Sequence, residues 1–134
     1  MIKRVVFDAY AIMALLEDEP GARIVTDLIV DEQTEIFISA INMGEIYYIL
    51  LRRSGKTVAE KVIQNILLEE TIKIEEPQWV RVKKAAEIKS AGSISYADAF
   101  ALALAKELQA QLVTGDPEIQ AVAAQNAVEI IWLA

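Results

Sequence analysis

The sequence predicts one α/β domain in which a parallel sheet is covered by helices on both faces. Short apolar segments rich in β-branched residues alternate along the chain with longer segments of helical periodicity, which is typical of strand–helix–strand units. The 134 residues suit a single core, and no linker, repeat or low-complexity segment interrupts them. We therefore expect residues 1–134 to form one domain.

The first half of the chain is expected to contain two strands and four helices. The two strands cover residues 4–7, where the strand ends at Asp8, and residues 35–39. The four helices cover residues 9–16, 22–30, 42 to about 53, and a segment capped by Thr57. Helical spacing predicts that the second and fourth helices turn these residues inward: Ile24, Val25 and Leu28, then Val62, Ile63, Ile66 and Leu67.

The second half is expected to contain three strands and three helices. The strands cover residues 71–75, which alternate and look more exposed, then 111–114 and 128–132. The helices cover 77 to about 90, with Trp79, Val82 and Ala86 on one side, then 95 to about 110, and 117–125. From Ala97 the middle one is apolar on nearly every side, so we expect it to be buried.

Composition restricts the chemistry that the chain can perform. It contains no cysteine and no histidine, which excludes disulfides, thiol catalysis, zinc–sulfur sites and imidazole bases. Carboxylate, hydroxyl and amide oxygens remain as ligands, and these favour hard cations such as Mg²⁺ or Mn²⁺. The net charge of −7 argues against general nucleic-acid binding, although it leaves room for a local basic track.

We expect a cytoplasmic protein without a membrane anchor. No apolar run approaches the roughly 18 residues of a membrane span. Residues 1–7 are basic and then apolar, like a small signal peptide, but Asp8 interrupts them too early and no small-residue cleavage site follows.

Four acids occupy positions that favour a functional site. Asp8 and Asp116 each follow a predicted strand, and Glu45 and Asp98 lie in the first turns of predicted helices. In open parallel sheets, ligands bind outside the carboxyl ends of the strands where the chain direction switches. If the strands are assigned correctly, Asp8 and Asp116 lie at that edge.

Helix capping is the competing explanation for each acid. Glu45 and Asp98 lie three residues after Asn42 and Ser95, which is capping-box spacing, and Asp116 precedes Pro117 as an N-cap would. A cap stabilises by about 1 kcal/mol, which is enough to explain one acid. Several carboxylates at one partly dry edge would repel each other by several kcal/mol, roughly, unless a divalent cation joined them.

The chain resembles the PIN domain, and in particular the VapC-like toxins of toxin–antitoxin pairs. The matching segments are residues 5–8, 41–48, 94–99 and 112–116, whose order and spacing fit across essentially the whole chain. The resemblance implies an α/β/α sandwich with a parallel five-stranded sheet and an endonuclease that hydrolyses RNA with Mg²⁺ or Mn²⁺. It assigns the metal-site acids Asp8, Glu45, Asp98 and Asp116, supported by Thr114.

The same resemblance implies a homodimer and a cognate antitoxin whose tail fills the active site. One position departs from the family, because such proteins commonly carry a small hydroxyl or amide residue where this chain has Tyr10. The phenol could orient a water or a phosphate, but a core ring with a hydrogen-bonded tip is the interpretation that we favour.

Basic and aromatic residues offer further candidates for contact with a partner. Arg52 and Lys56 share the helical face of Glu45 if that helix continues, and with Arg53 they could guide a phosphate backbone or meet an antitoxin. A solvated helix end would explain them equally. The helix face around Tyr47 and Tyr48 must be covered either by the next helix or by a dimer mate or antitoxin, and we favour such a partner. Three aromatic residues look like core: Trp79, Phe100 and Trp132.

Other functions remain open at this stage. The chain could be a PIN-fold binding module without catalysis, or a housekeeping RNA-processing nuclease. A haloacid-dehalogenase-like phosphatase would need a second aspartate at position 10, and a receiver domain would need an acidic pair after the first strand. No glycine-rich phosphate loop exists, which excludes nucleotide hydrolases.

Overall fold

The structure, a computed structural model, describes all residues 1–134 and is built on five parallel strands. Their order across the sheet is β3-β2-β1-β4-β5, so β1 lies at the centre, with β2 and β3 added on one side of it and β4 and β5 on the other. The strands are β1 (Lys3–Phe7), β2 (Thr34–Ser39), β3 (Ile72–Glu75), β4 (Gln111–Thr114) and β5 (Ile130–Trp132).

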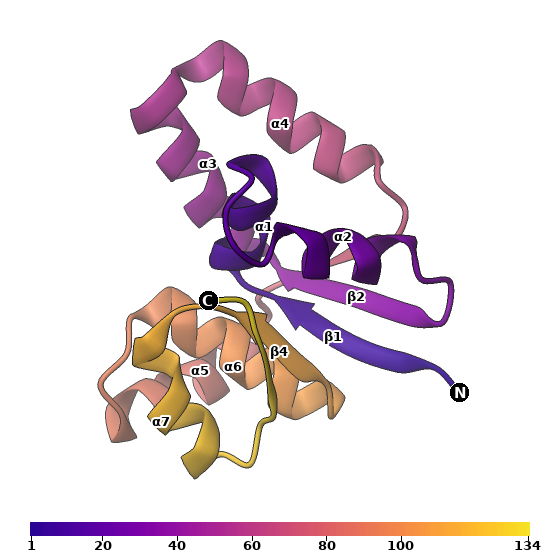
Figure 1. Ribbon diagram of the computed structural model, residues 1–134. Helices are drawn as coiled ribbons and strands as arrows, with labels where there is room; N and C mark the ends of the chain where they lie inside the picture. The colour runs from indigo at the N-terminus through magenta and orange to yellow at the C-terminus, as the bar shows by residue number, and fades with distance from the viewer.

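Helices cover both faces of this sheet, which confirms the predicted three-layer architecture (Figure 1). One layer contains α1 (Ala9–Leu16), α2 (Ala22–Val30), α3 (Ala40–Ser54) and α4 (Lys56–Leu68). The opposite layer contains α5 (Trp79–Ala91), α6 (Tyr96–Leu108) and α7 (Pro117–Gln125). The predicted boundaries of α1, α2, β4 and α7 agree with the structure residue for residue.

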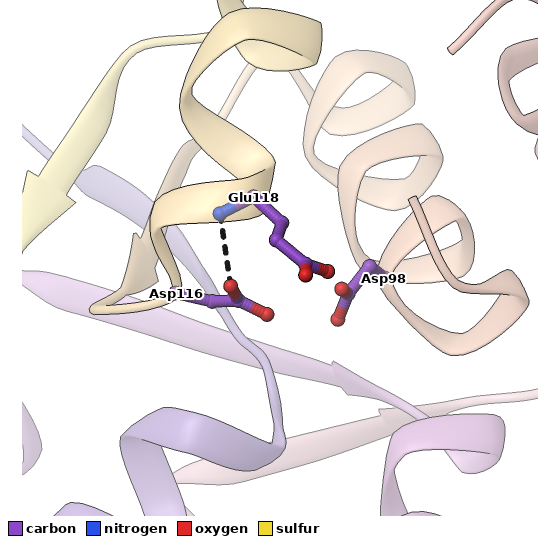
Figure 2. Close-up of side chains that lie close together, drawn as sticks. All are labelled: Asp98, Asp116 and Glu118. Carbon is purple, nitrogen blue, oxygen red and sulfur yellow. Dashed lines mark hydrogen bonds between the residues drawn. The ribbon is translucent and has the colours of Figure 1, made fainter. Parts of the chain in front are cut away.

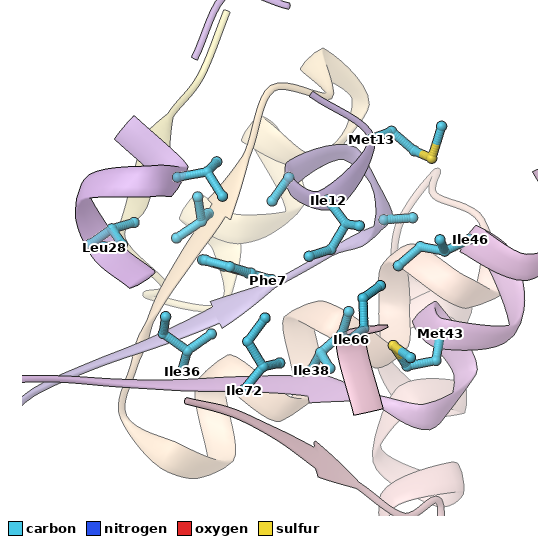
Figure 3. Packing of buried hydrophobic residues seen from close by; sticks show 14 of the residues in the cluster. Phe7, Ile12, Met13, Leu28, Ile36, Ile38, Met43, Ile46, Ile66 and Ile72 are labelled. Atoms are coloured by element: carbon cyan, nitrogen blue, oxygen red, sulfur yellow. The ribbon is translucent and has the colours of Figure 1, made fainter. Parts of the chain in front are cut away.

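The core is divided between the two faces because side chains of a strand alternate in direction. Val5 and Phe7 of β1 pack into the cluster beneath α1–α4, part of which is drawn in Figure 3, whereas Val6 between them packs into the cluster beneath α5–α7. All three are fully buried. A continuous apolar run with no polar alternation is what a strand covered on both faces requires.

Helix α6 is the most deeply enclosed helix, as its composition predicted. All eight residues from Asp98 to Ala105 are buried, because the helix packs on the sheet on one side and on α5 on the other. Its many alanines allow these close contacts. The first turn of α6, which carries Asp98, therefore has little freedom to move.

Several predicted inner faces were wrong in part, although the helices themselves are correct and Val25, Leu28 and Ile66 are buried as predicted. Four residues expected to face inward are exposed: Ile24, Leu67, Trp79 and Ala86. The residues buried in their place include Ala59, Ala85 and Ile88. Alanine carries little hydrophobic signal in a sequence, yet it occupies the positions where neighbouring helices approach most closely. Thr57 was also wrong as the cap of α4, because Gly55 occupies that position and makes no side-chain cap.

None of the seven helices has both the length and the apolar character that crossing a bilayer requires.

Candidate functional site

Two of the four predicted acids follow neighbouring strands at the carboxyl edge of the sheet. Asp8 follows β1 and Asp116 follows the residue after β4, and these two strands are paired neighbours. The order in which strands are added to the sheet switches sides between β1 and β4, so the acids stand at the topological switch point where ligands of open α/β sheets bind. Asp98 reaches the same edge from the start of α6.

Three carboxylates converge at this edge, and one of them was not predicted. Asp98, Asp116 and Glu118 each offer an oxygen, and these oxygens lie within 4.8 Å of one another. Figure 2 shows the three side chains converging from α6 and from the start of α7. Sequence reasoning missed Glu118 because an acid in the first turn of a helix is already explained by the helix dipole.

Capping and a second role coexist in Asp116 because a carboxylate has two oxygens. Its Oδ1 accepts a hydrogen bond from the Glu118 amide at 2.9 Å, which caps α7 as predicted and leaves Oδ2 free for another ligand. The Thr114 hydroxyl accepts a hydrogen bond from the Asp116 amide at 3.1 Å. Thr114 is fully buried, so this bond fixes the turn that presents the carboxylate.

Asp8 is buried almost completely while it caps α1. Its carboxylate accepts a hydrogen bond from the Ala11 amide at 3.0 Å, and only 2% of the residue is exposed. Burial raises the pKa of Asp8 to about 7, against the lowering effect of the Thr114 hydroxyl and the Ala11 amide. The negative charges of Asp98 and Glu45 raise it further. These two hydrogen bonds compensate only part of the cost of burying the ionised carboxylate, since the pKa remains well above its ordinary value.

Asp98 is in a similar electrostatic position. Burial raises its pKa to about 7, and the nearby charges of Asp116 and Glu45 act in the same direction. The Ser95 hydroxyl accepts a hydrogen bond from the Asp98 amide at 3.1 Å, so the predicted cap forms. The return bond of a capping box, from the Ser95 amide to the Asp98 carboxylate, is absent, which leaves the carboxylate directed to the cluster.

Glu45 approaches from α3 in a way that corrects the capping-box interpretation. The helix begins at Ala40 and is capped by Ser39, two residues before the predicted start at Asn42. Asn42 therefore lies inside the first turn, and its side-chain Nδ2, not its backbone amide, donates to Glu45 Oε1 at 3.4 Å. Burial raises the pKa of Glu45, and the charge of Asp116 adds to this effect.

No basic side chain neutralises these acids. All six ion pairs in the structure lie elsewhere, and none contains Asp8, Glu45, Asp98, Asp116 or Glu118. Carboxylates gathered without a cation are unfavourable unless they are protonated or bind a metal. Burial, and to a smaller extent the repulsion between these acids, raises the pKa values of Asp8 and Asp98.

Tyr10 fills space beside the cluster, and Gly115 makes that possible. A Cβ atom at position 115 would lie 2.4 Å from the Tyr10 Cε1 atom, so only glycine accommodates the ring. The ring also packs against the core beneath α1–α4. The interpretation of Tyr10 as a core ring is therefore supported, and a hydrogen-bonded tip stays a prediction.

The predicted basic track is only partly continuous with the acids. Arg52 lies two turns after Glu45 on the same face of α3, and its guanidinium lies 5.8 Å from the centre of the exposed Tyr48 ring. Helix α3 ends at Ser54, where Gly55 adopts a φ of 85°, so Lys56 begins α4 and does not share that face. Arg53 forms an ion pair with Glu17.

The aromatic residues differ from one another in burial. Phe100 is buried as predicted, Trp132 is partly buried, and Trp79 is 71% exposed at the start of α5, which corrects its assignment to the core. Helix α4 covers Tyr47, whose hydroxyl donates to Glu60 Oε1 at 2.6 Å, whereas Tyr48 remains exposed.

The carboxylates fit a divalent cation in both chemistry and spacing. Oxygen ligands on opposite sides of one Mg²⁺ are separated by about 4 Å, close to the observed grouping. The set contains oxygen ligands only, which suits Mg²⁺ or Mn²⁺. Asp98, Asp116 and Glu118 would hold such an ion, with Asp8 and Glu45 beside it.

Comparisons with known proteins agree with this arrangement. The family model of the PIN domain matches residues 5–125. Among proteins of curated function, none matches the sequence.

Solved structures share the fold across nearly the whole chain. VapC20 of Mycobacterium tuberculosis, described as a toxin that cleaves the sarcin-ricin loop, is 21% identical with a TM-score of 0.69, over 87% of this chain and 93% of that one. VapBC2 of Rickettsia felis, bound to a promoter DNA fragment, is 15% identical with a TM-score of 0.73, over 98% and 99%. DNA-bound VapBC of Salmonella typhimurium is 13% identical with a TM-score of 0.74, over 100% of both chains.

Proposed function

The chain belongs to the PIN domain family, and from this membership and the geometry of its acids we propose that it is a metal-dependent endoribonuclease. It would hydrolyse phosphodiester bonds of RNA as the toxin of a VapBC-type pair. One observation carries the proposal: acids from four separate segments gather at the switch point of the sheet, and no basic side chain neutralises them.

The cofactor that we propose is Mg²⁺ or Mn²⁺, held by Asp98, Asp116 and Glu118 with Asp8 and Glu45 adjacent. A bound divalent cation activates water and stabilises the negative charge that develops on a phosphoryl group. The protein's own task is to hold the carboxylates in place before substrate arrives. The capping bonds of Asp8 and Asp116 and the buried Thr114 hydroxyl serve that purpose, since each restricts one carboxylate or the turn that carries it.

We propose that the RNA strand extends from the acidic cluster along the face of α3. Tyr48 lies one turn beyond Glu45 and is exposed, and Arg52 donates a hydrogen bond to its hydroxyl at 3.3 Å. Arg52 has no carboxylate partner, so its charge is free for a phosphate, while an exposed tyrosine ring suits a stacked base. Lys56 would contact the backbone from the start of α4, or meet an antitoxin.

We also propose a homodimer and a cognate antitoxin in a cytoplasmic setting. An apolar groove of about 190 Å³ lies between α1, α2 and α4 and would accept an apolar segment of the antitoxin. It is lined by Ile12, Leu15, Leu16, Ile29, Val62 and Ile66, among others. The VapBC structures named above, which share this fold, support such a partner.

The proposal is tested by incubating purified protein with a mixed-sequence, structured RNA in Mn²⁺, in Mg²⁺ and in EDTA. We expect cleavage in either metal, none in EDTA, and none with Asp98→Asn. Asp27→Asn, which removes a charge from the exposed face of α2, is the matched control and should cleave like the wild type.

Calorimetric titration with Mn²⁺ on the same samples separates the alternatives. An intact metal site without cleavage of mixed RNA would direct the search to one selected RNA target. Absence of Mn²⁺ binding by the wild type would refute the nuclease and favour a catalytically silent PIN-fold binding module. Broad processing of cellular RNA precursors, without an antitoxin, would instead indicate a housekeeping nuclease.

A further inference from the structure

A buried amide links the two helices that carry Glu45 and Asp98. Asn42 lies in the first turn of α3 and is fully buried. Its Nδ2 donates to two oxygens, Glu45 Oε1 at 3.4 Å and the carbonyl of Ala97 at 3.2 Å. Ala97 immediately precedes Asp98 in the first turn of α6. One NH₂ group therefore joins two acid-bearing segments, although Asn42 and Ala97 are 55 residues apart in the sequence.

The orientation of this amide is determined by its neighbours. An amide offers hydrogen-bond donors on one side and an acceptor on the other. If the Asn42 side chain were reversed, its Oδ1 would face the Glu45 carboxylate and the Ala97 carbonyl, which are both acceptors. The observed orientation is the only one that gives Glu45 and Ala97 a donor.

This orientation leaves Asn42 Oδ1 without a partner. Among the buried side-chain polar atoms of the structure, it is the only one without a hydrogen bond. An unpaired acceptor in the interior is destabilising, and an apolar side chain of similar size would avoid the cost. Stability alone therefore does not explain an amide here, whereas the two bonds of its Nδ2 do.

The position of Glu45 explains why such a bond matters. Its charge lies close to those of Asp98 and Asp116, which repel it. Glu45 is only partly buried and has three rotatable bonds, so without a restraint its carboxylate would turn to solvent. The Asn42 bond to Glu45 Oε1 opposes that movement.

We propose that Asn42 is a positioning residue that holds Glu45 toward the metal site, anchored on the Ala97 carbonyl of α6. This inference rests on the proposed metal-dependent function. Asn42 touches neither metal nor substrate and acts through Glu45. Removal of such a supporting partner lowers metal affinity by about 10- to 100-fold in known metal sites.

The test is a double-mutant cycle on Mn²⁺ affinity, measured by calorimetry on the full chain. The four proteins are the wild type, Asn42→Leu, Glu45→Gln and the double variant. We expect Asn42→Leu to weaken Mn²⁺ binding by about tenfold in the wild type. In the Glu45→Gln background it should have no further effect, because the carboxylate that it positions is already gone.

Asn126→Leu is the matched control. Asn126 also donates its side-chain amide to a carbonyl, that of Val122, but at the far end of α7 from the acids. Its replacement should leave Mn²⁺ affinity unchanged. Thermal unfolding in EDTA shows whether each variant folds.

A kinetic readout separates positioning from general damage. If Asn42 acts through Glu45 on the metal, cleavage by Asn42→Leu should fall at limiting Mn²⁺ and recover at saturating Mn²⁺. Equal losses of affinity in both backgrounds, or unchanged affinity in Asn42→Leu, would overturn the inference while the nuclease function stood. Failure of the wild type to bind Mn²⁺ would overturn the nuclease and the inference together.

Discussion

The buried charge of Asp8 predicts that the metal-free protein loses stability as pH rises. In the unfolded chain Asp8 releases its proton near its ordinary pKa of 3.8, whereas in the folded protein burial and the neighbouring acids raise this pKa to about 7. Between these two values the folded state binds the proton more tightly, so the free energy of unfolding decreases with increasing pH. The loss is complete above pH 7, and it is absent below the unfolded pKa.

The magnitude follows from the difference between the two pKa values. A difference of about three corresponds to about 4 kcal/mol, since one pKa unit is worth about 1.4 kcal/mol. Asp8→Asn removes the charge while keeping an oxygen that can accept the Ala11 amide hydrogen. The variant should therefore be more stable than the wild type by about 4 kcal/mol at pH 8, and by less than half of that at about pH 5.

The assay is urea denaturation of both proteins at a series of pH values in EDTA. Asp31→Asn is a control of opposite sign, because Asp31 is exposed and the Gln33 amide and Thr34 hydroxyl lower its pKa. The ionised Asp31 carboxylate stabilises the folded state above its ordinary pKa, and this stabilisation is lost as pH falls. Asp31→Asn should therefore be less stable than the wild type at pH 8. A gain from Asp8→Asn that is equal at pH 5 and pH 8, or no gain at all, would refute the reasoning.

Two further predictions concern the cluster and the turn beside it. Glu118→Gln should weaken Mn²⁺ binding by about tenfold. It should leave the thermal unfolding temperature in EDTA almost unchanged, since the residue is exposed and its side chain caps no helix. Wild-type Mn²⁺ affinity of this variant in calorimetry would show that Glu118 is not a metal ligand. Gly115→Ala should destabilise the protein by about 1–3 kcal/mol, because its Cβ would overlap the Tyr10 ring. Tyr10→Ala should remove most of that additional cost in urea denaturation, and a cost that persists would show that the ring is not its cause.

The regular elements were largely predictable from local sequence. Strands that are buried on both faces are continuous apolar runs, and Pro117 and the positive φ of Gly55 mark helix boundaries that depend on a few adjacent residues. The inner faces of α2, α4 and α5 were less predictable. Helices that have alanine at their closest contacts give a weak amphipathic signal, so Ala59 and Ala85 were not recognised as core residues.

The residues of the candidate site also divide into those that the sequence predicted and those that it did not. Asp8 and Asp116 could be placed together from the sequence because parallel strands end at one edge, and that inference needs only strand assignments. Glu118 and Asn42 could not be found, since each has a sufficient local explanation: a favourable helix dipole for Glu118, and a helix start for Asn42.

The sequence by itself determined the fold class, the oxygen-only donor chemistry and the order of the four acids along the chain. These properties depend on composition and on local periodicity, which folding does not change. Only the tertiary structure decided that Glu118 joins Asp98 and Asp116, that Asn42 bridges α3 and α6, and that Lys56 leaves the face of Glu45. Each of these depends on how helices distant in sequence pack against one sheet, because packing alone sets the distance between side chains that no local pattern connects.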